Sequence, residues 1–172
     1  MIAIILTILV TFLFSSVLEW FIHGHIMHGS LGTERIRQLH TDHHTKYPPD
    51  SYKNYNHGPN VHLPLWMGVY VIGVNAIFGA LASYIFNNWT IIIVVVVISI
   101  LYFFVYNYTH TCLHVPTGRW FEGTRVFKFI DSYHILHHTK MPEPGKFNNV
   151  AILCPLPDIF FGTWIGRNKQ NK

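Results

Sequence analysis

The sequence predicts an all-α membrane protein with about three transmembrane helices and a His-rich helical cap on their cytoplasmic side. Three observations lead to this fold class. Charged residues make up only 12% of the 172 residues, against about 25% in an ordinary soluble domain. Three apolar stretches each reach the roughly 20 residues that cross a bilayer core. Thirteen histidines lie between and after these stretches.

Length, charge and cysteine content narrow the possibilities further. A chain of 172 residues fits a single domain, residues 1–172. The formal net charge of +4 is too small and too scattered to indicate a nucleic-acid partner. The two cysteines, Cys112 and Cys154, do not form a CxxC pair, and they exclude the disulfide framework of a small secreted protein.

The first apolar stretch covers residues 2–22, with Glu19 as its only charged side chain. A cleaved signal peptide would begin with a positively charged region and end at a small-residue cleavage site. The first four residues contain no Lys or Arg. We therefore interpret this stretch as an uncleaved membrane anchor.

The second and third stretches, residues 63–86 and 89–108, are joined by two asparagines and predict a helical hairpin. Residues 91–98 are all β-branched, a run that would indicate a buried strand in water. A single strand cannot satisfy its backbone hydrogen bonds in lipid, so length and context favour a helix. The second stretch is also rich in glycine, alanine and serine, which allow close helix packing.

Two polar segments, residues 23–62 and 109–172, follow the first and third stretches, so three spans place them on one side of the membrane. They contain all 12 Lys and Arg residues. The positive-inside rule therefore predicts that both segments are cytoplasmic and that the N-terminus is outside. The same topology collects all 13 histidines at the cytoplasmic face.

Ten of the histidines form four clusters with mostly helical spacing. Residues three and four apart lie on one face of a helix, and neutral imidazole is a good ligand for iron, zinc, copper and nickel. Two metal ions with about five ligands each would use all ten side chains. The predicted metal ligands are His23, His28, His40, His43, His44, His110, His114, His134, His137 and His138.

The first cluster fits this pattern least well. His23 and His28 are five residues apart, which is about 140° around a regular α-helix. Either the helix ends there or the two side chains serve different ions, and His25 with His28 is a rival pair. We interpret His25, His57 and His62 as ordinary surface or core histidines. A pH-sensing role for the whole set would not need this spacing.

In order along the chain, the clusters resemble the four histidine boxes of the fatty acid hydroxylase/sterol desaturase superfamily of integral-membrane di-iron oxygenases. The resemblance covers most of residues 19–164. Gly24, Asn107 and Val115 stand where the family commonly has Arg, Asp and His, and none of these departures removes one of the ten histidines. The matching segments are Glu19-Trp20-Phe21-Ile22-His23…His28, His40-Thr41-Asp42-His43-His44, Tyr106-Asn107-Tyr108-Thr109-His110…His114, Tyr133-His134-Ile135-Leu136-His137-His138 and Asp158-Ile159-Phe160-Phe161-Gly162-Thr163-Trp164.

The resemblance implies two iron ions that activate O2 and oxidise an unactivated C–H bond of a lipid, by hydroxylation or by desaturation. It implies no catalytic residue beyond the metal ligands. A fatty acyl chain is the first expectation for the substrate, and a carotenoid or sterol-type ring is the alternative. A membrane protein that transports or stores metal is an alternative from another class, and it would place more polar residues inside the spans.

Such a reaction needs two external electrons per turnover. The sequence has no GxGxxG motif and no cysteine cluster, so we expect a separate donor of the ferredoxin or cytochrome type. Basic residues of the cytoplasmic face would meet an acidic partner, although they suit anionic lipid headgroups equally well. These residues are Arg119, Arg125, Lys128, Lys140 and Lys146.

Metal-bound imidazole usually donates its second N–H to a carboxylate or a carbonyl. Five polar residues near the boxes are candidates for that role, with helix capping or surface solvation as the alternative for each. They are Glu19, Asp42, Asn107, Asp131 and Asp158. In the last motif, Gly162 is expected to permit a tight turn.

Overall fold

The computed structural model describes residues 2–53, 63–139 and 146–166, and this part of the chain is helical with no strand. The predicted all-α class is therefore confirmed. A π-helix, η1, continues the first α-helix, and two short 3-10 turns, η2 and η3, precede α3 and α5. The elements are α1 (Ile2–Phe21), η1 (Ile22–His28), α2 (Glu34–Lys46), η2 (Pro49–Ser51), α3 (Leu65–Ile85), α4 (Thr90–His114), η3 (Trp120–Gly123), α5 (Arg125–Thr139) and α6 (Leu156–Phe160).

Three of these helical segments are long and apolar enough to cross a membrane: Ile2–His28, Leu65–Ile85 and Thr90–His114. They match the three predicted spans, but two extend further than the sequence suggested. The first continues through η1 instead of ending at residue 22, and the third runs six residues past residue 108. The first and third histidine boxes therefore lie on the ends of the membrane helices themselves. Polar residues remain helical there because His110 and His114 are buried.

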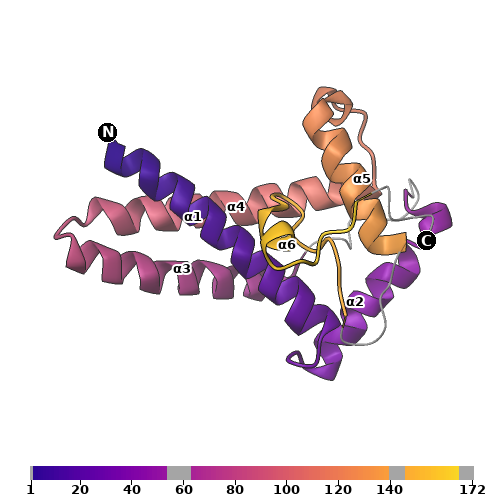
Figure 1. Ribbon diagram of the computed structural model, residues 1–172, viewed down its shortest axis with the longest axis horizontal. Helices are drawn as coiled ribbons and strands as arrows, with labels where there is room; N and C mark the ends of the chain where they lie inside the picture. The colour runs from indigo at the N-terminus through magenta and orange to yellow at the C-terminus, as the bar shows by residue number, and fades with distance from the viewer. Residues whose placement is uncertain (1, 54–62, 140–145, 167–172) are drawn as a thin grey trace.

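The α3–α4 hairpin and α1 form a bundle of three helices (Figure 1). The N-terminus and the α3–α4 turn lie at one end of this bundle, while α2 and α5 lie at the other. The clusters carried by α2 and α5 therefore meet the histidines at the ends of η1 and α4.

Small and polar side chains let the three helices pack closely. A Cβ at Gly68 would lie 2.6 Å from the ring of Phe103, and one at Gly79 would lie 3.1 Å from Val95. Buried Asn75 of α3 donates through Nδ2 to the hydroxyl of buried Ser15 of α1 at 3.3 Å. The predicted role of small residues in close helix packing agrees with these contacts.

Candidate metal centre

The π-helix η1 decides how the first cluster is used. Its hydrogen bonds join residues five apart, so His23 and His28 lie on the same side of this helical segment. Their rings stack with centroids 5.4 Å apart and an interplanar angle of 20°. On a regular α-helix the two side chains would point in different directions, so the sequence alone leaves open whether they serve the same ion. A π-helical turn, which is frequent at functional sites, brings the two imidazoles together.

His25 lies apart from that pair, in an aromatic environment. Its ring contacts Trp20, Phe21 and Phe147 at centroid distances of 5.1, 5.3 and 4.8 Å. The other two histidines interpreted as ordinary residues, His57 and His62, lie outside the described residues.

Eight of the ten predicted ligands form two compact groups. Within each group, one nitrogen atom from every imidazole lies within 4.8 Å of the others. The first group consists of His23, His28, His40 and His137, and the second of His43, His114, His134 and His138. Each HxxHH box is therefore divided between the two groups, a division that the sequence did not reveal.

The remaining two predicted ligands lie directly beside these groups. His44 Nε2 is 3.1 Å from His40 Nε2, and the His44 ring is 4.2 Å from that of His138. The ring of His110 is 4.9 Å from that of His134 and 5.0 Å from that of His114. The fold thus collects all ten side chains in one place, and their binding of metal stays a prediction.

The distances between the ring nitrogens fit a metal ion. In the first group, His40 Nε2 lies 2.8 Å from His28 Nε2 and 3.2 Å from His23 Nε2. In the second, the Nε2 atoms of His114 and His134 are 3.1 Å apart. Two nitrogens at right angles around an ion, each about 2.1 Å from it, would be about 3.0 Å apart. The imidazoles therefore converge at the spacing of ligands that share one ion.

The second nitrogen of four imidazoles is held by a backbone carbonyl. His23 and His137 donate through Nδ1 to the carbonyls of Val150 and Asn148, each at 2.8 Å. His138 and His114 donate in the same way to the carbonyls of Tyr47, at 3.0 Å, and Tyr52, at 3.2 Å.

A carbonyl can only accept, so in each case the proton is on Nδ1 and the lone pair is on Nε2. This is the tautomer that a metal ligand needs. The sequence pointed to side chains for this role, because a backbone carbonyl in a loop leaves no residue-type signal.

The five polar candidates form their hydrogen bonds with other groups. Asp42 is exposed and accepts from Gln38. Asp131 pairs with Lys53 at 2.7 Å. Asn107 accepts from the backbone N–H of Leu63 at 2.7 Å and donates to the carbonyl of Phe103. Glu19 is buried and accepts from the Tyr102 hydroxyl and the N–H of Ile152.

Asp158 acts on the site through the loop that carries two of the carbonyls. Its fully buried carboxylate accepts from the N–H groups of Val150 and Ala151 at 3.2 and 2.7 Å, and from the Tyr133 hydroxyl at 2.5 Å. Residues 148–150 are thereby held where their carbonyls meet His23 and His137. Together with the bond from Ile152 to Glu19, this makes both carboxylates positioning groups, one step removed from the imidazoles.

Thr163, in the segment Asp158–Trp164, connects the loop of residues 148–152 to α1 by hydrogen bonds. The Thr163 hydroxyl donates to Asp158 at 2.6 Å and accepts from Trp20 Nε1 at 2.9 Å. Gly162 has a φ of 72°, which confirms the turn expected there.

Burial keeps the imidazoles outside the membrane helices neutral. Loss of solvation lowers the pKa of His137 to about 4, although the Asn148 carbonyl and Asp158 favour its charged form. Burial, followed by repulsion between neighbouring imidazoles, lowers the pKa values of His40 and His134 well below the usual range. Neutral imidazoles are the form that binds metal.

The metal-free protein is expected to lose stability as the pH falls below about 6.5. Between this value and about 4, the unfolded chain binds protons at His137 that the folded chain does not accept. Each such histidine contributes a slope of about 1.4 kcal/mol per pH unit. Thermal unfolding of chelator-treated protein at pH 7.5 and pH 5.5 measures this loss. A midpoint that rises on acidification would contradict the burial of neutral imidazoles.

Comparison with protein families shows what the chain is similar to. A family model described as fatty acid hydroxylase matches residues 8–163, which include both histidine groups and the Asp158–Thr163 part of the last motif. No curated protein and no solved structure gives a significant match to the chain.

Proposed function

Because the chain belongs to the fatty acid hydroxylase family, we propose that it is a membrane-bound di-iron oxygenase that uses O2 to hydroxylate a lipid C–H bond, on a fatty acyl chain. The observation that carries the proposal is the convergence of neutral imidazoles into two groups at the ends of the membrane helices. A lipid can reach a site there without leaving the bilayer. The family is one of lipid hydroxylases and desaturases.

The two groups would hold one iron ion each, with His44 and His110 completing the first and second sets. The pair of ions would supply the reduction of O2 by two external electrons and the removal of hydrogen from the C–H bond. In balance, the substrate gains one oxygen atom, and two electrons and two protons convert the other to water. The carbonyls of residues 47, 52, 148 and 150 hold four imidazoles in the tautomer that binds metal.

The electrons would come from a ferredoxin or cytochrome-type partner. Exposed Arg119, Arg125 and Lys128 lie around η3 and the start of α5, and Lys146 is exposed as well. Lys140 lies outside the described residues. This basic surface suits an acidic donor, because complementary charge speeds association.

The function is tested by mass spectrometry of lipids from cells with and without the protein. We expect fatty acyl chains that carry one additional oxygen atom. An oxidised carotenoid or sterol in their place would support the alternative substrate class, and no oxidised lipid would contradict the proposal. Purified protein with iron, O2 and lipid is expected to be inactive until a donor and its reductase are added. Sustained turnover with NAD(P)H alone would contradict the need for a donor.

The proposed topology places the histidine groups and the C-terminus in the cytoplasm and the N-terminus outside. Reporter fusions at the Asn87–Asn88 turn and at Lys172 are therefore expected to report opposite sides, with Lys172 cytoplasmic. The physical reason is that all 12 basic residues lie in the two segments assigned to the cytoplasm. Readings from the same side would contradict the arrangement of three spans.

A further inference from the structure

Two apolar cavities adjoin the histidine groups. The outer cavity has a volume of about 140 Å³ and the inner cavity about 40 Å³. Four side chains line both, so the cavities are neighbours. These shared side chains are Met27, Leu63, Met67 and Tyr106.

The outer cavity faces both histidine groups. His40 of the first group lines it, as do His43 of the second group and the adjacent His110. At its rim, Leu39 of α2 and Trp66 of α3 are 54% and 53% exposed. Because α3 begins at residue 65, this rim lies where a membrane helix starts. A lipid chain that enters here passes directly in front of the imidazoles.

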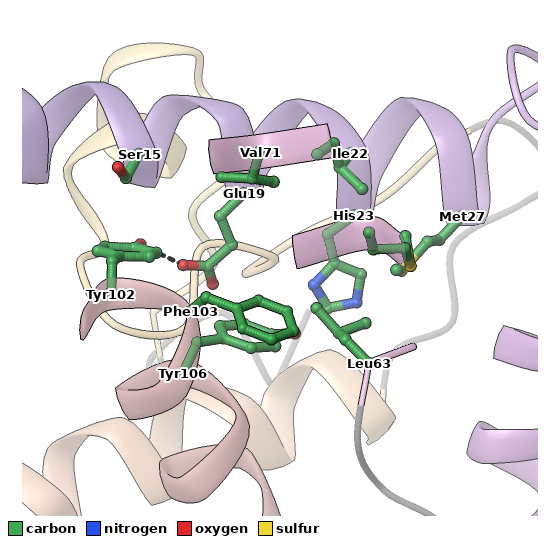
Figure 2. A pocket seen from close by; sticks show the side chains of 11 residues that line it. Ser15, Glu19, Ile22, His23, Met27, Leu63, Val71, Tyr102, Phe103 and Tyr106 are labelled. Atoms are coloured by element: carbon green, nitrogen blue, oxygen red, sulfur yellow. Dashed lines mark hydrogen bonds between the residues drawn. The ribbon is translucent and has the colours of Figure 1, made fainter. Parts of the chain in front are cut away.

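The inner cavity continues from there between α1, α3 and α4 (Figure 2). His23 lines its near end, and Ser15, eight residues earlier on α1, lines its far end. Eight residues of helix span about 12 Å. At the far end, Asn75 donates to the Ser15 hydroxyl at 3.3 Å. Between this end and His23, the Tyr102 hydroxyl donates to Glu19 (Figure 2). The Ser15–Asn75 pair marks the far end of the inner cavity.

We propose that a straight-chain acyl lipid binds methyl end first, with its last carbons in the inner cavity and the carbons next to them in the outer cavity, facing the imidazoles. Oxidation then falls near the methyl end of the chain. This inference rests on the proposed function.

The size of the inner cavity favours a chain end over a ring. A dry apolar cavity of about 150 Å³ holds one benzene ring, so 40 Å³ admits only the end of a chain. The lining also disfavours a carboxylate head group. It contains no Lys or Arg, and Glu19 already accepts from Tyr102 and Ile152. A second carboxylate buried there would have no cationic partner.

Val71 of α3 is the side chain that sets how deeply the chain enters. It lines the inner cavity, belongs to neither histidine group, and packs against the cluster of Ile22, Met27 and Met67. Val69 offers a matched control, because it is the same residue type on the same helix but is 63% exposed. Val71→Phe fills the inner cavity, whereas Val69→Phe adds the same ring on the outside of the bundle.

The first experiment measures binding by photocrosslinking in nanodiscs with palmitic acid that carries a diazirine on its terminal carbon. Peptide mass spectrometry is expected to find the label on side chains that line the inner cavity alone, at Ser15, Val71 or Phe103. Val71→Phe should lower this labelling about tenfold, equivalent to about 1.4 kcal/mol, and Val69→Phe should leave it unchanged. Equal labelling in the two variants would overturn the proposal. So would labelling of the inner lining by palmitic acid with the diazirine beside its carboxylate.

The second experiment locates the oxidised carbon in the product. We expect it within the last few carbons of the chain. Val71→Phe should move it closer to the methyl end, and Val71→Ala, which deepens the cavity, should move it away. Oxidation beside the carboxylate, or the same position in all variants, would overturn the inference and leave the proposed function intact. Labelling of the inner lining without any lipid oxidation would overturn the proposed function and support the cavity as a binding site.

Discussion

Replacing His137 by alanine is expected to remove the bound metal and abolish lipid oxidation. Its Nε2 lies 3.2 Å from that of His28, and its ring is 4.6 Å from that of His23. The substitution removes one ligand of the first group and leaves the Asn148 carbonyl without its donor. Losing only the group that is hydrogen-bonded to a metal ligand lowers metal affinity about 10–100-fold. Losing the ligand itself should therefore lower it more. Metal content by mass spectrometry and lipid turnover measure the two effects.

His25→Ala is the matched control for this variant. It also removes a histidine near the end of a helical segment, but its ring lies against Trp20, Phe21 and Phe147 and belongs to neither group. We expect it to retain metal and turnover, with a loss of about 1 kcal/mol or less in stability. If His25→Ala lost metal as completely as His137→Ala, the assignment of ligands would be wrong.

Replacing Asp158 by alanine is expected to destabilise the fold by more than about 3 kcal/mol, because hydrogen bonds to a charged group contribute about 1.5–3 kcal/mol each. The substitution leaves the N–H groups of Val150 and Ala151 and the Tyr133 hydroxyl without their acceptor. The loop that holds His23 and His137 would loosen, so metal content should fall as well. Thermal unfolding in detergent, followed by circular dichroism, measures the loss of stability.

Asp42→Ala provides the control, because Asp42 is another acidic residue of the motifs but is exposed and accepts only from Gln38 among its described contacts. Its effect should stay within about 0.5 kcal/mol. Asp158→Asn keeps one acceptor oxygen and should fall between the two alanine variants. Equal effects of Asp42→Ala and Asp158→Ala would refute the positioning role of Asp158.

The ends of the membrane helices show where a sequence pattern stops being informative. Hydropathy alone predicts an end at residue 108, since the residues that follow are polar. The helix continues to His114 because Cys112, Leu113 and His114 are buried, and burial comes from packing against other segments. Similarly, residues 22–28 form a π-helix that no periodicity of apolar residues predicted.

The sequence by itself predicted the all-α class and the positions of three spans, and it singled out ten clustered histidines. Hydropathy and helical spacing are local properties, so they do not depend on how the helices pack. The tertiary structure decided which imidazoles share a group. In the last box, His134 and His138 join the second group and His137 joins the first.

The tertiary structure also decided which backbone carbonyls accept a hydrogen bond from the second ring nitrogen of the imidazoles. The carbonyls of Val150 and Asn148 reach His23 and His137 because Asp158 and Glu19 fix their loop. Every residue has a carbonyl, so residue type does not distinguish these two. Their role follows from distances between segments far apart in the chain, and packing sets those distances.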